Sequence, residues 1–483
     1  MTLGTIQHSP SDRSEVLNSN LYGLIEAQAR QRAACPALIL PDDSEVSYAT
    51  LIDQVARISS LLKMRGVEPG DRIMVQANKS PDKLALYLAT LKVGAIFVPL
   101  NSAYTASEID YFRNDAKPVL FVSDPVALAA EAAECEPWGE TIERSSTDLA
   151  ALIYTSGTTG RSKGAMLSHG ALAANALALI DVWGVTAQDT LLHALPIFHA
   201  HGLFISAHCS LLTGSPMLWL PKFDEDTVLK ALPKATVMMG VPTFYTRLLA
   251  DERFTEEAAR PLRLFISGSA PLLESTFAEF EERTGHRILE RYGMSEAMVI
   301  ASNPLEGTRS PGSVGYPLPG MELRIAGGDD TGGIEIRGAS LFSGYWDMPE
   351  KTAEEFTADG FFITGDVGRT DPDGRLWISG RSKDLIISGG YNVYPKEIEL
   401  VLDEVPGVVE SAVIGVPHPD FGEAVVAVLV GTADPDAVIA AARQQLASFK
   451  TPKKIIFLDE LPRNAMGKVQ KAALRADYAG SFA

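Results

Sequence analysis

Residues 152–164 read LIYTSGTTGRSKG: an apolar start, six consecutive Thr, Ser or Gly residues, and then two cations, Arg161 and Lys163. The apolar start is typical of a buried strand. The small residues supply backbone amides and hydroxyl donors, and the cations add positive charge, as the oxygens of a polyphosphate require. We therefore expect a strand that leads into a phosphate-binding loop. A polar loop without a ligand is the alternative, which the two cations disfavour.

The spacing within this loop excludes two common nucleotide-binding folds. A P-loop needs GxxxxGK[ST], whereas in GTTGRSKG at 157–164 the lysine precedes the final glycine instead of following it. No GxGxxG follows a predicted strand, so a dinucleotide-binding fold is not expected either.

Helical and strand-like patterns alternate on both sides of the loop. Residues 47–65 carry apolar side chains at helical spacing, and residues 72–77 have the pattern of a buried strand. Such alternation predicts a mostly parallel sheet covered by helices. After about Gly320, short alternating segments separated by Gly and Asp turns predict antiparallel strands, and a compact α+β part follows beyond Gly380.

The expected fold class is therefore α/β, with a large N-terminal α/β domain of several subdomains and a smaller, mobile α+β C-terminal domain. Residues 381–384 are polar or charged and interrupt two apolar strands, which is typical of a solvent-exposed hinge. The predicted parts are a flexible N-terminal tail at 1–18, the large domain at 19–380, the hinge at 381–384 and the small domain at 385–483.

The composition is that of a packed protein without a polyanionic partner. Of the 483 residues, 46% are apolar and 21% are charged, which excludes a disordered chain. The 42 basic and 61 acidic side chains give a formal net charge of −19, so neither nucleic acid nor an anionic membrane is expected as a partner. The first 18 residues lack the apolar core of a signal peptide, and the three cysteines lack metal-ligand spacing. We expect a cytoplasmic protein with reduced thiols.

Five motifs, in order along the chain, carry a resemblance to a known family. They are YTSGTTGRSKG at 154–164, RYGMSE at 291–296, ITGD at 363–366, GRSKDLIISGGYNVYPKEIE at 380–399 and PRNAMGKVQK at 462–471. With these motifs the chain resembles the adenylate-forming acyl-CoA synthetase superfamily, which includes adenylation domains and luciferases. The resemblance implies that a carboxylate attacks the α-phosphate of ATP to give an acyl-adenylate and pyrophosphate, and that a thiol then displaces AMP.

The resemblance also implies a role for individual residues of the motifs. Tyr292 would stack on adenine, while Asp366 and Arg381 would contact the ribose. Lys468 would bridge the substrate carboxylate and the α-phosphate during adenylation. The catalytic residues implied are Lys163, His199, Glu296 and Lys468; those implied to bind ATP or AMP are Thr155, Ser156, Gly157, Thr158, Thr159, Gly160, Lys163, Ser267, Gly268, Ser269, Arg291, Tyr292, Gly293, Met294, Ser295, Asp366 and Arg381; and those implied to bind Mg²⁺ are Thr155 and Glu296.

The last two motifs imply a small domain that rotates about Lys383 between the two half-reactions. Lys468 would be presented first, and the thiol would reach the adenylate after the rotation. The co-substrates implied are ATP with Mg²⁺, and CoA. The residues implied to bind the pantetheine of CoA are Ser388, Gly389, Gly390 and Tyr391.

Arg291 bears on which acid is used. Strand alternation in ILERY at 288–292 places Arg291 on the face of Leu289 and opposite Glu290, so the guanidinium would point inward. A buried guanidinium needs an anion, and a second carboxylate on the substrate would meet it bidentately. An ion pair between Arg291 and either Glu290 or Glu296 is the alternative.

Other stretches make the chain most similar, within the superfamily, to the malonyl-CoA synthetases. PIFHAHG at 196–202 places His199 and His201 on one face of an extended segment, and LPKFDED at 220–226 and GVPTFYTRLL at 240–249 add to the similarity. The predicted substrate is malonate. The residues predicted to bind its carboxylates are Arg291, His201 and Ser269.

Two departures from that group leave the acid open between malonate and a branched or other short diacid. Phe198 stands where those relatives have tyrosine, and the stretch 297–300 after Glu296 reads AMVI in place of more polar residues. A more apolar wall would admit an alkyl branch, as in methylmalonate. A stand-alone enzyme that loads a carrier-protein thiol, a synthetase for other short or medium-chain acids, and a non-catalytic nucleotide-binding protein remain alternatives.

Overall fold

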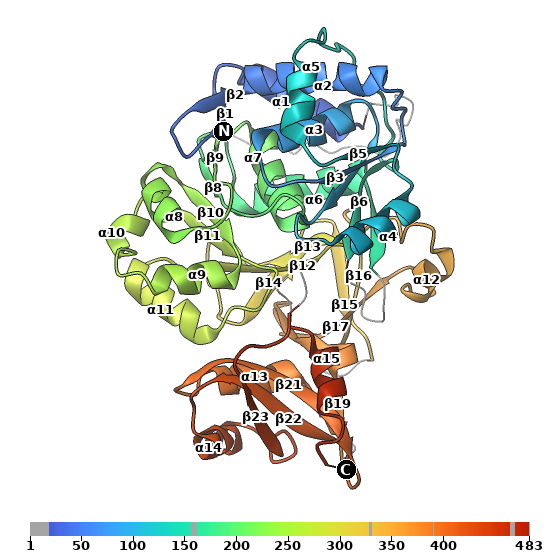
Figure 1. Ribbon diagram of the computed structural model, residues 1–483. Coiled ribbons are helices and arrows are strands. Elements are labelled where there is room, and N and C mark those ends of the chain that lie inside the picture. The colour runs from blue at the N-terminus through green and yellow to red at the C-terminus, as the bar shows by residue number, and fades with distance from the viewer. Residues whose placement is uncertain (1–18, 156–161, 328–330, 390, 464–468, 483) are drawn as a thin grey trace, which may run out of the picture.

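The computed structural model describes residues 19–155, 162–327, 331–389, 391–463 and 469–482 (Figure 1). Several predicted features lie outside the described residues. These are the tail at 1–18, Ser156, Gly157, Thr158, Thr159 and Gly160 of the phosphate loop, Gly390 and Lys468.

One five-stranded sheet carries the phosphate-loop motif. Its order is β5-β3-β4-β6-β7, in which the first four strands are parallel and β6 and β7 form an antiparallel pair. Thr155 at the end of β6 pairs with Lys163 at the start of β7, so the two ends of the loop are held together. The strands are β3 (Arg72–Gln76), β4 (Ile96–Leu100), β5 (Leu120–Val122), β6 (Leu149–Thr155) and β7 (Lys163–Ser168).

Amphipathic helices form beside this sheet for reasons visible in the sequence. The side chain of Ser47 accepts a hydrogen bond from the amide of Thr50 and so caps α2 (Tyr48–Met64), and Ser80 caps α3 (Pro81–Lys92) in the same way. The apolar residues of α2 at helical spacing, among them Leu51 and Val55, are buried. The other helices of this part of the chain are α1 (Leu21–Gln31), α4 (Ala106–Ala116), α5 (Pro125–Ala132) and α6 (His169–Trp183).

A thirteen-stranded sheet changes from parallel to antiparallel pairing at β12. Its order is β15-β16-β17-β18-β14-β13-β12-β11-β10-β8-β9-β1-β2. β11 runs parallel to β12, whereas β13 runs antiparallel to it. Antiparallel pairing after about Gly320 is confirmed, but it begins earlier, with β13. The strands are β1 (Pro36–Ile39), β2 (Glu45–Ser47), β8 (Leu191–His193), β9 (Met217–Trp219), β10 (Val237–Gly240), β11 (Leu264–Ser267), β12 (Leu289–Met294), β13 (Met298–Ser302), β14 (Ser313–Pro317), β15 (Met321–Ile325), β16 (Gly332–Gly338), β17 (Phe362–Thr370) and β18 (Leu376–Arg381).

The parallel strands of this sheet point with their carboxyl ends toward the candidate active site. In open α/β sheets the loops that follow these ends form the ligand crevice. The loop after β8 leads into η1 (His201–Ala207), a π-helix that continues as α7 (His208–Thr213). The prediction that His201 lies in an extended segment was therefore wrong, because it begins this helix. A single π turn inside a helix is frequent at functional sites.

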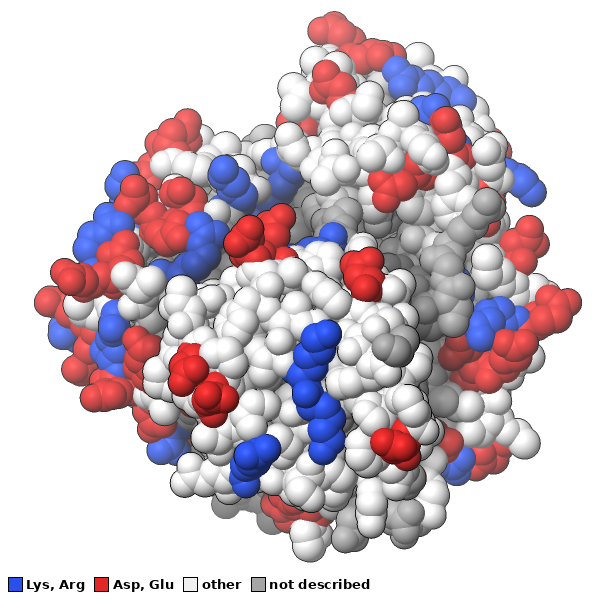
Figure 2. Space-filling model, turned by 60° about the horizontal axis from the view of Figure 1, so that its bottom comes forward, with Lys and Arg blue, Asp and Glu red and all other residues white. Residues whose placement is uncertain are grey.

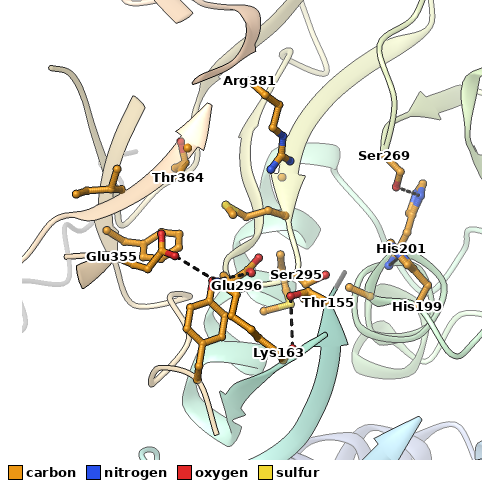
Figure 3. Close-up of a pocket in the computed structure, with 18 of the residues that line it drawn as sticks. Thr155, Lys163, His199, His201, Ser269, Ser295, Glu296, Glu355, Thr364 and Arg381 are labelled. Carbon is orange, nitrogen blue, oxygen red and sulfur yellow. Dashed lines mark hydrogen bonds and ion pairs between the residues drawn. The ribbon is translucent and has the colours of Figure 1, made fainter. Parts of the chain in front are cut away.

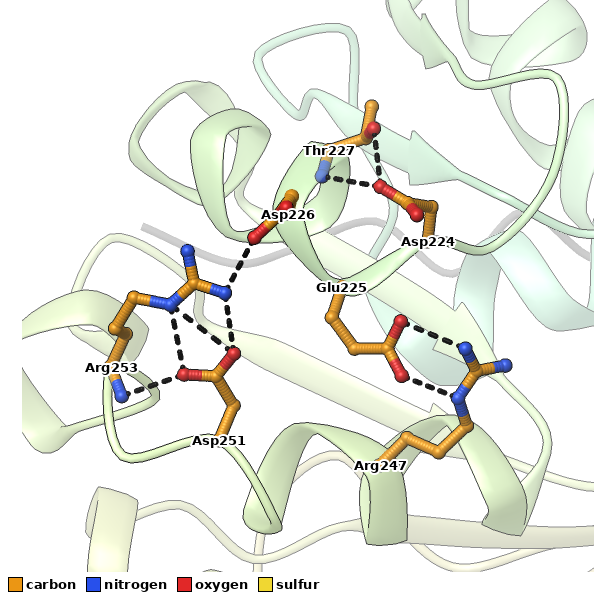
Figure 4. Close-up of polar contacts among 7 residues, drawn as sticks. All are labelled: Asp224, Glu225, Asp226, Thr227, Arg247, Asp251 and Arg253. Atoms are coloured by element: carbon orange, nitrogen blue, oxygen red, sulfur yellow. Dashed lines mark hydrogen bonds and ion pairs between the residues drawn. The ribbon is translucent and has the colours of Figure 1, made fainter.

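The acidic stretch after β9 has a structural role on the surface. Asp224 caps α8 (Glu225–Ala231) by accepting from the amide of Thr227 at 3.0 Å. Arg247 of α9 (Pro242–Leu249) binds Glu225 bidentately, with Nε and Nη2 donating to the two carboxylate oxygens (Figure 4). Arg253 similarly joins Asp226 to Asp251. The carboxylates of LPKFDED thus tie α8 to α9 and to the turn that follows. Two further helices of this region are α10 (Glu256–Ala259) and α11 (Glu274–Thr284).

A third sheet with its own apolar core lies below the rest of the molecule in Figure 1. Its order is β20-β19-β22-β21, with β23 parallel to β22. The short helix η3 (Ser382–Asp384) connects it to β18. The fold class, a large α/β part with a smaller α+β C-terminal part, is confirmed. The elements are β19 (Ile386–Ser388), β20 (Tyr391–Val393), β21 (Val408–His418), β22 (Gly422–Gly431), β23 (Lys454–Leu458), α13 (Pro395–Asp403), α14 (Pro435–Gln445) and α15 (Lys471–Asp477), while α12 (Pro349–Glu354) belongs to the large part.

The surface charge follows the composition. Figure 2 shows one face of the molecule, on which acidic and basic side chains are interspersed and no broad basic patch is seen. Within the described parts of the chain, no helix combines the length and apolarity needed to cross a bilayer.

Candidate active site

A cavity of about 360 Å³ opens where η1, β12, β13 and the β6–β7 pair meet β17 and η3 (Figure 3). Most of the predicted residues that the structure describes face it. Those that line it are Thr155, Lys163, His199, His201, Ser269, Arg291, Gly293, Met294, Ser295, Glu296, Arg381 and Lys383.

The remaining predicted residues lie around this lining. Gly268 packs against Arg291, and Tyr292 contacts Asp366, which pairs with Arg381. Ser267 is buried at the end of β11. The predicted pantetheine-binding residues lie on the small C-terminal part and do not line this cavity: Ser388, Gly389 and Tyr391.

Arg291 forms one end of the cavity as a buried cation. It is 5% exposed, and its Nε and Nη2 atoms have no hydrogen-bond partner among the described residues. A Cβ on Gly268 would lie 2.3 Å from Nε, so a glycine is needed where the guanidinium packs. Burial lowers the pKa of Arg291 to about 10, which leaves the group charged at neutral pH. The described residues show no ion pair from Arg291 to Glu290 or Glu296.

His201 and Ser269 lie at the same end. The Oγ atom of Ser269 is 3.2 Å from Nδ1 of His201, and Nε2 of His201 has no described partner. Burial, followed by the charge of Arg291, holds the pKa of His201 well below its usual value, so the imidazole is neutral. The amide of His201 donates to Nδ1 of His199 at 3.3 Å, which joins the two predicted histidines. We call Arg291, His201 and Ser269 the acid end.

The opposite end of the cavity holds paired charges. Asp366 of β17 and Arg381 of β18 are cross-strand neighbours, and Nε of Arg381 lies 2.8 Å from Oδ1 of Asp366. The hydroxyl of Tyr292 donates to the other carboxylate oxygen. Lys163 lies 3.2 Å from Oε1 of Glu355, and its ammonium is 3.9 Å from the centroid of the Tyr345 ring. We call this region, together with Glu296, the nucleotide end.

Glu296 is a buried carboxylate at the nucleotide end. It is 6% exposed, and its Oε1 accepts a hydrogen bond from the Tyr345 hydroxyl at 3.0 Å. Burial raises the pKa of Glu296, while the hydrogen bond from Tyr345 and the charges of Arg381 and Lys163 oppose that rise. These neighbours therefore favour the ionised form of the carboxylate.

The geometry is that of a site for an anionic nucleotide and an acid, and comparison with known proteins identifies the family. Residues 25–346 match the family model described as AMP-binding enzyme, and residues 397–468 match the model of the AMP-binding enzyme C-terminal domain. The chain belongs to the AMP-binding enzyme family.

Relatives of this AMP-binding enzyme act on different acids. The chain is 35% identical to the malonate–CoA ligase of Arabidopsis thaliana, over 90% of this chain and 85% of that protein. It is 36% identical to the indoleacetate–CoA ligase of Aromatoleum aromaticum, over 90% of this chain and 93% of that protein. The crystal structure of ATP-bound MatB from Rhodopseudomonas palustris covers 97% of this chain and 100% of its own, with 48% identity and a TM-score of 0.91. The resemblance to the adenylate-forming superfamily is confirmed.

The donor set of this AMP-binding enzyme fits Mg²⁺ that arrives with a nucleotide. Mg²⁺ retains several waters and is usually held by one or two carboxylates together with substrate phosphates. The described residues contain no group of three or more His, Cys, Asp or Glu that would form an all-protein metal site. Glu296 supplies a buried carboxylate in the cavity lining, and the hydroxyl of Thr155 is directed to the carbonyl of Lys163 at 3.4 Å.

Two cavity residues of the AMP-binding enzyme, Tyr345 and Glu355, are absent from the sequence-based site. Tyr345 reaches Glu296 across 49 positions of sequence, and Glu355 reaches Lys163 across 192. Neither lies in one of the five motifs. The available signal was the aromatic pair Tyr345-Trp346 shortly before ITGD, which alone specifies no partner.

Proposed function

We propose that this AMP-binding enzyme is an acid–thiol ligase that converts malonate to malonyl-CoA through a malonyl-adenylate, with release of AMP and pyrophosphate. The observation that carries the proposal is Arg291, a buried residue that lines the cavity and whose Nε and Nη2 atoms have no hydrogen-bond partner among the described residues. The similarity to a malonate–CoA ligase and to MatB supports it. The co-substrates are ATP, bound with Mg²⁺, and CoA.

A diacid suits the acid end better than a monoacid does. An unpaired buried charge is costly, and a carboxylate that accepts two parallel N–H bonds recovers that free energy. In malonate one carboxylate is free to react while the second, one methylene away, meets Arg291. His201 is neutral and Ser269 carries a hydroxyl, so both are suited to hydrogen bonding with the same carboxylate without repelling it.

The reaction divides between the two ends of the cavity. The reacting carboxylate oxygen attacks the α-phosphorus of ATP, a P–O bond forms, and the bond to pyrophosphate breaks. Lys163 would neutralise phosphate oxygens, Lys468 would bridge the substrate carboxylate and the α-phosphate, and Glu296 would hold the Mg²⁺ that accompanies ATP; such groups stabilise the charge that develops in transfer. Asp366 and Arg381 hold the ribose, and Tyr292 packs on the adenine. The sulfur of CoA then attacks the acyl carbon, and a C–S bond forms while the thiol loses its proton. The C–O bond to AMP breaks, and AMP leaves.

The domain boundaries and the hinge belong to the same proposal. Lys383 lies in η3, between the large part at 19–380 and the small part at 385–483, and it also lines the cavity. Asp384 of the same turn pairs with Arg475 of α15 at 3.1 Å. Rotation about Lys383 would bring the segment of Ser388, Gly389 and Tyr391 to the adenylate, where pantetheine enters. The three cysteines are unpaired, in keeping with the cytoplasmic location that we propose.

Methylmalonate is a second candidate, favoured by one observation. Of the apolar residues that follow Glu296, Met298 lines the cavity, and Ile205 of η1 lies in the same lining. An apolar wall next to a diacid site has room for a methyl branch at low desolvation cost. Both acids use the same cation, so the test includes both.

The test is AMP release from ATP and CoA with a panel of acids, for wild type and Arg291→Ala. Wild type is expected to turn over malonate or methylmalonate. The kcat/KM of the variant for these diacids should fall about a thousandfold, as for the loss of a buried charge pair. Its activity with acetate and propionate should be retained or increase. A uniform fall across all acids would show that Arg291 is structural. Offering a carrier-protein phosphopantetheine in place of CoA identifies the preferred thiol.

A further inference from the structure

Lys79 is a half-buried lysine that none of the catalytic roles above uses. It lies between β3 and the Ser80 cap of α3, in the five-stranded sheet's part of the chain. Its Nζ is 2.7 Å from Nδ1 of His193 and 2.6 Å from the His193 carbonyl oxygen, and it lies 4.2 Å from the centroid of the Trp219 ring. Burial lowers the pKa of Lys79 well below its usual value, and the described residues provide no carboxylate partner for it.

His193 connects Lys79 to the acid end through hydrogen bonds. It is 1% exposed at the end of β8, and its Nε2 is 2.8 Å from the carbonyl oxygen of Gly202. A carbonyl oxygen only accepts, so Nε2 carries the proton and Nδ1 is the acceptor. An ammonium is the donor that this Nδ1 requires. Lys79 thereby selects the tautomer with which His193 holds Gly202.

Gly202 is the second residue of η1 and directly follows His201. A Cβ at Gly202 would lie 2.1 Å from the Pro196 carbonyl oxygen, so the turn is tightly packed at this point. A shift of the Gly202 carbonyl would therefore move His201, whose Nδ1 contacts Ser269 and whose ring lies in the field of Arg291.

We propose that Lys79 is a positioning residue for the acid end: through the imidazole of His193 it fixes the π turn that places His201. The inference rests on the proposed acid site. Among the described residues, Lys79 has no hydrogen bond or ion pair to Lys163 or Glu296 and does not line the cavity, so the effect of its loss should fall on acid binding. Without the ammonium, Nδ1 of His193 is a buried acceptor without a donor, and the imidazole turns or changes tautomer to satisfy it.

Lys83 is the matched control. It is a buried lysine at the start of α3, it donates to the Ala77 carbonyl at 2.7 Å, and burial lowers its pKa to about 8. It has no described hydrogen bond to His193. A general cost of removing a lysine from this region therefore appears in both variants, whereas an effect through His193 appears only at Lys79.

The experiment measures steady-state AMP release by Lys79→Met and Lys83→Met with malonate and ATP varied in turn. We expect Lys79→Met to raise the KM for malonate about tenfold, with the KM for ATP and the kcat at saturating malonate changed less than twofold. Lys83→Met should leave both KM values unchanged. Lys79→Arg, which retains a charged donor, should recover most of the loss.

A double variant tests the route through His193. His193→Gln should raise the KM for malonate selectively, and adding Lys79→Met to it should cause little further loss, because the two act in series. Equal effects of Lys79→Met and Lys83→Met, or additive losses in the double variant, would overturn the inference. If Lys79→Met does not fold, an unchanged KM for malonate in His193→Gln overturns it as well. Failure of wild type to turn over any short diacid would instead refute the proposed function.

Discussion

The two ends of the cavity differ in how their charged side chains are paired. At the acid end Arg291 is buried, the part of the chain that the structure describes offers its Nε and Nη2 no partner, and its neighbour His201 is neutral. At the nucleotide end cations and carboxylates already meet, as Arg381 with Asp366 at 2.8 Å and Lys163 with Glu355 at 3.2 Å. In the proposed function, one end would gain its missing anion from the substrate, whereas the other would exchange partners when phosphates arrive.

This difference separates specificity from reactivity. A cation without an internal partner rejects a monoacid, because the buried group would stay unpaired in that complex. Compensated charges bind less selectively, but they can regroup around a phosphate whose charge changes during transfer. In the proposed function, the missing anion at the acid end would determine which acid binds, and the charged groups at the nucleotide end would carry the chemistry.

Removing the charge of Glu296 tests the nucleotide end most severely. Glu296→Gln keeps the shape and loses the anion, so we expect ATP–pyrophosphate exchange with malonate to fall about a thousandfold. Malonate KM should change little. The matched control is Glu290→Gln on β12, the strand that precedes the turn of Glu296, since Glu290 is also a buried glutamate and burial raises its pKa to about 8. Similar losses in the two variants would refute the distinction between a catalytic and a structural carboxyl.

An internal anion at the acid end should abolish the contrast between the ends. Ser269 has φ +71°, a conformation that Asp and Asn tolerate well, and its side chain lies in the cavity beside His201. Ser269→Asp is expected to raise the KM for malonate about a hundredfold, because the new carboxylate competes for Arg291. Ser269→Asn has the same shape without the charge. A comparable KM in the two variants would show that Arg291 does not select for the anion.

Tyr345 allows a smaller change at the nucleotide end. Tyr345→Phe removes the hydroxyl that donates to Glu296 at 3.0 Å and keeps the ring over which Lys163 lies. Loss of one hydrogen bond to a charged group predicts about a tenfold fall in exchange rate, with malonate KM unchanged. Tyr316→Phe is the control, since its hydroxyl also donates to a carboxylate, that of Asp373 at 3.0 Å, but on the surface. A normal rate in Tyr345→Phe would mean that Glu296 needs no such partner.

Much of both ends follows from local sequence, whereas their contacts do not. Strand alternation predicted that Arg291 points inward, and the small-residue loop marked Lys163 as a phosphate ligand. The partners Tyr345 and Glu355, which lie before and at the end of α12, depend on how segments far apart in the sequence pack, which local periodicity does not specify. The π turn at His201 was missed because its pattern of apolar residues does not differ from that of an ordinary helix or a buried strand.

The weakest predicted effect concerns Glu290, which precedes Arg291 in the chain. The proposed acid end requires that the carboxyl of Glu290 is not an anionic partner of Arg291. Burial raises the pKa of Glu290 from its ordinary value of 4.5 to about 8. Between these two pH values the folded protein keeps the proton on Glu290, whereas the unfolded chain has released it. Its contribution to the free energy of unfolding is therefore complete below pH 4.5 and is lost as the pH rises through about 8.

Between pH 7 and pH 9 that loss amounts to about 1 kcal/mol, which is one or two degrees in Tm for a chain of this size. Thermal melts of wild type and Glu290→Gln across this range isolate the effect, since every other titrating group is common to both. Wild type should lose stability relative to the variant as the pH rises. A constant difference would mean that Glu290 is ionised throughout, and the acid end would then have an anion of its own one residue from Arg291.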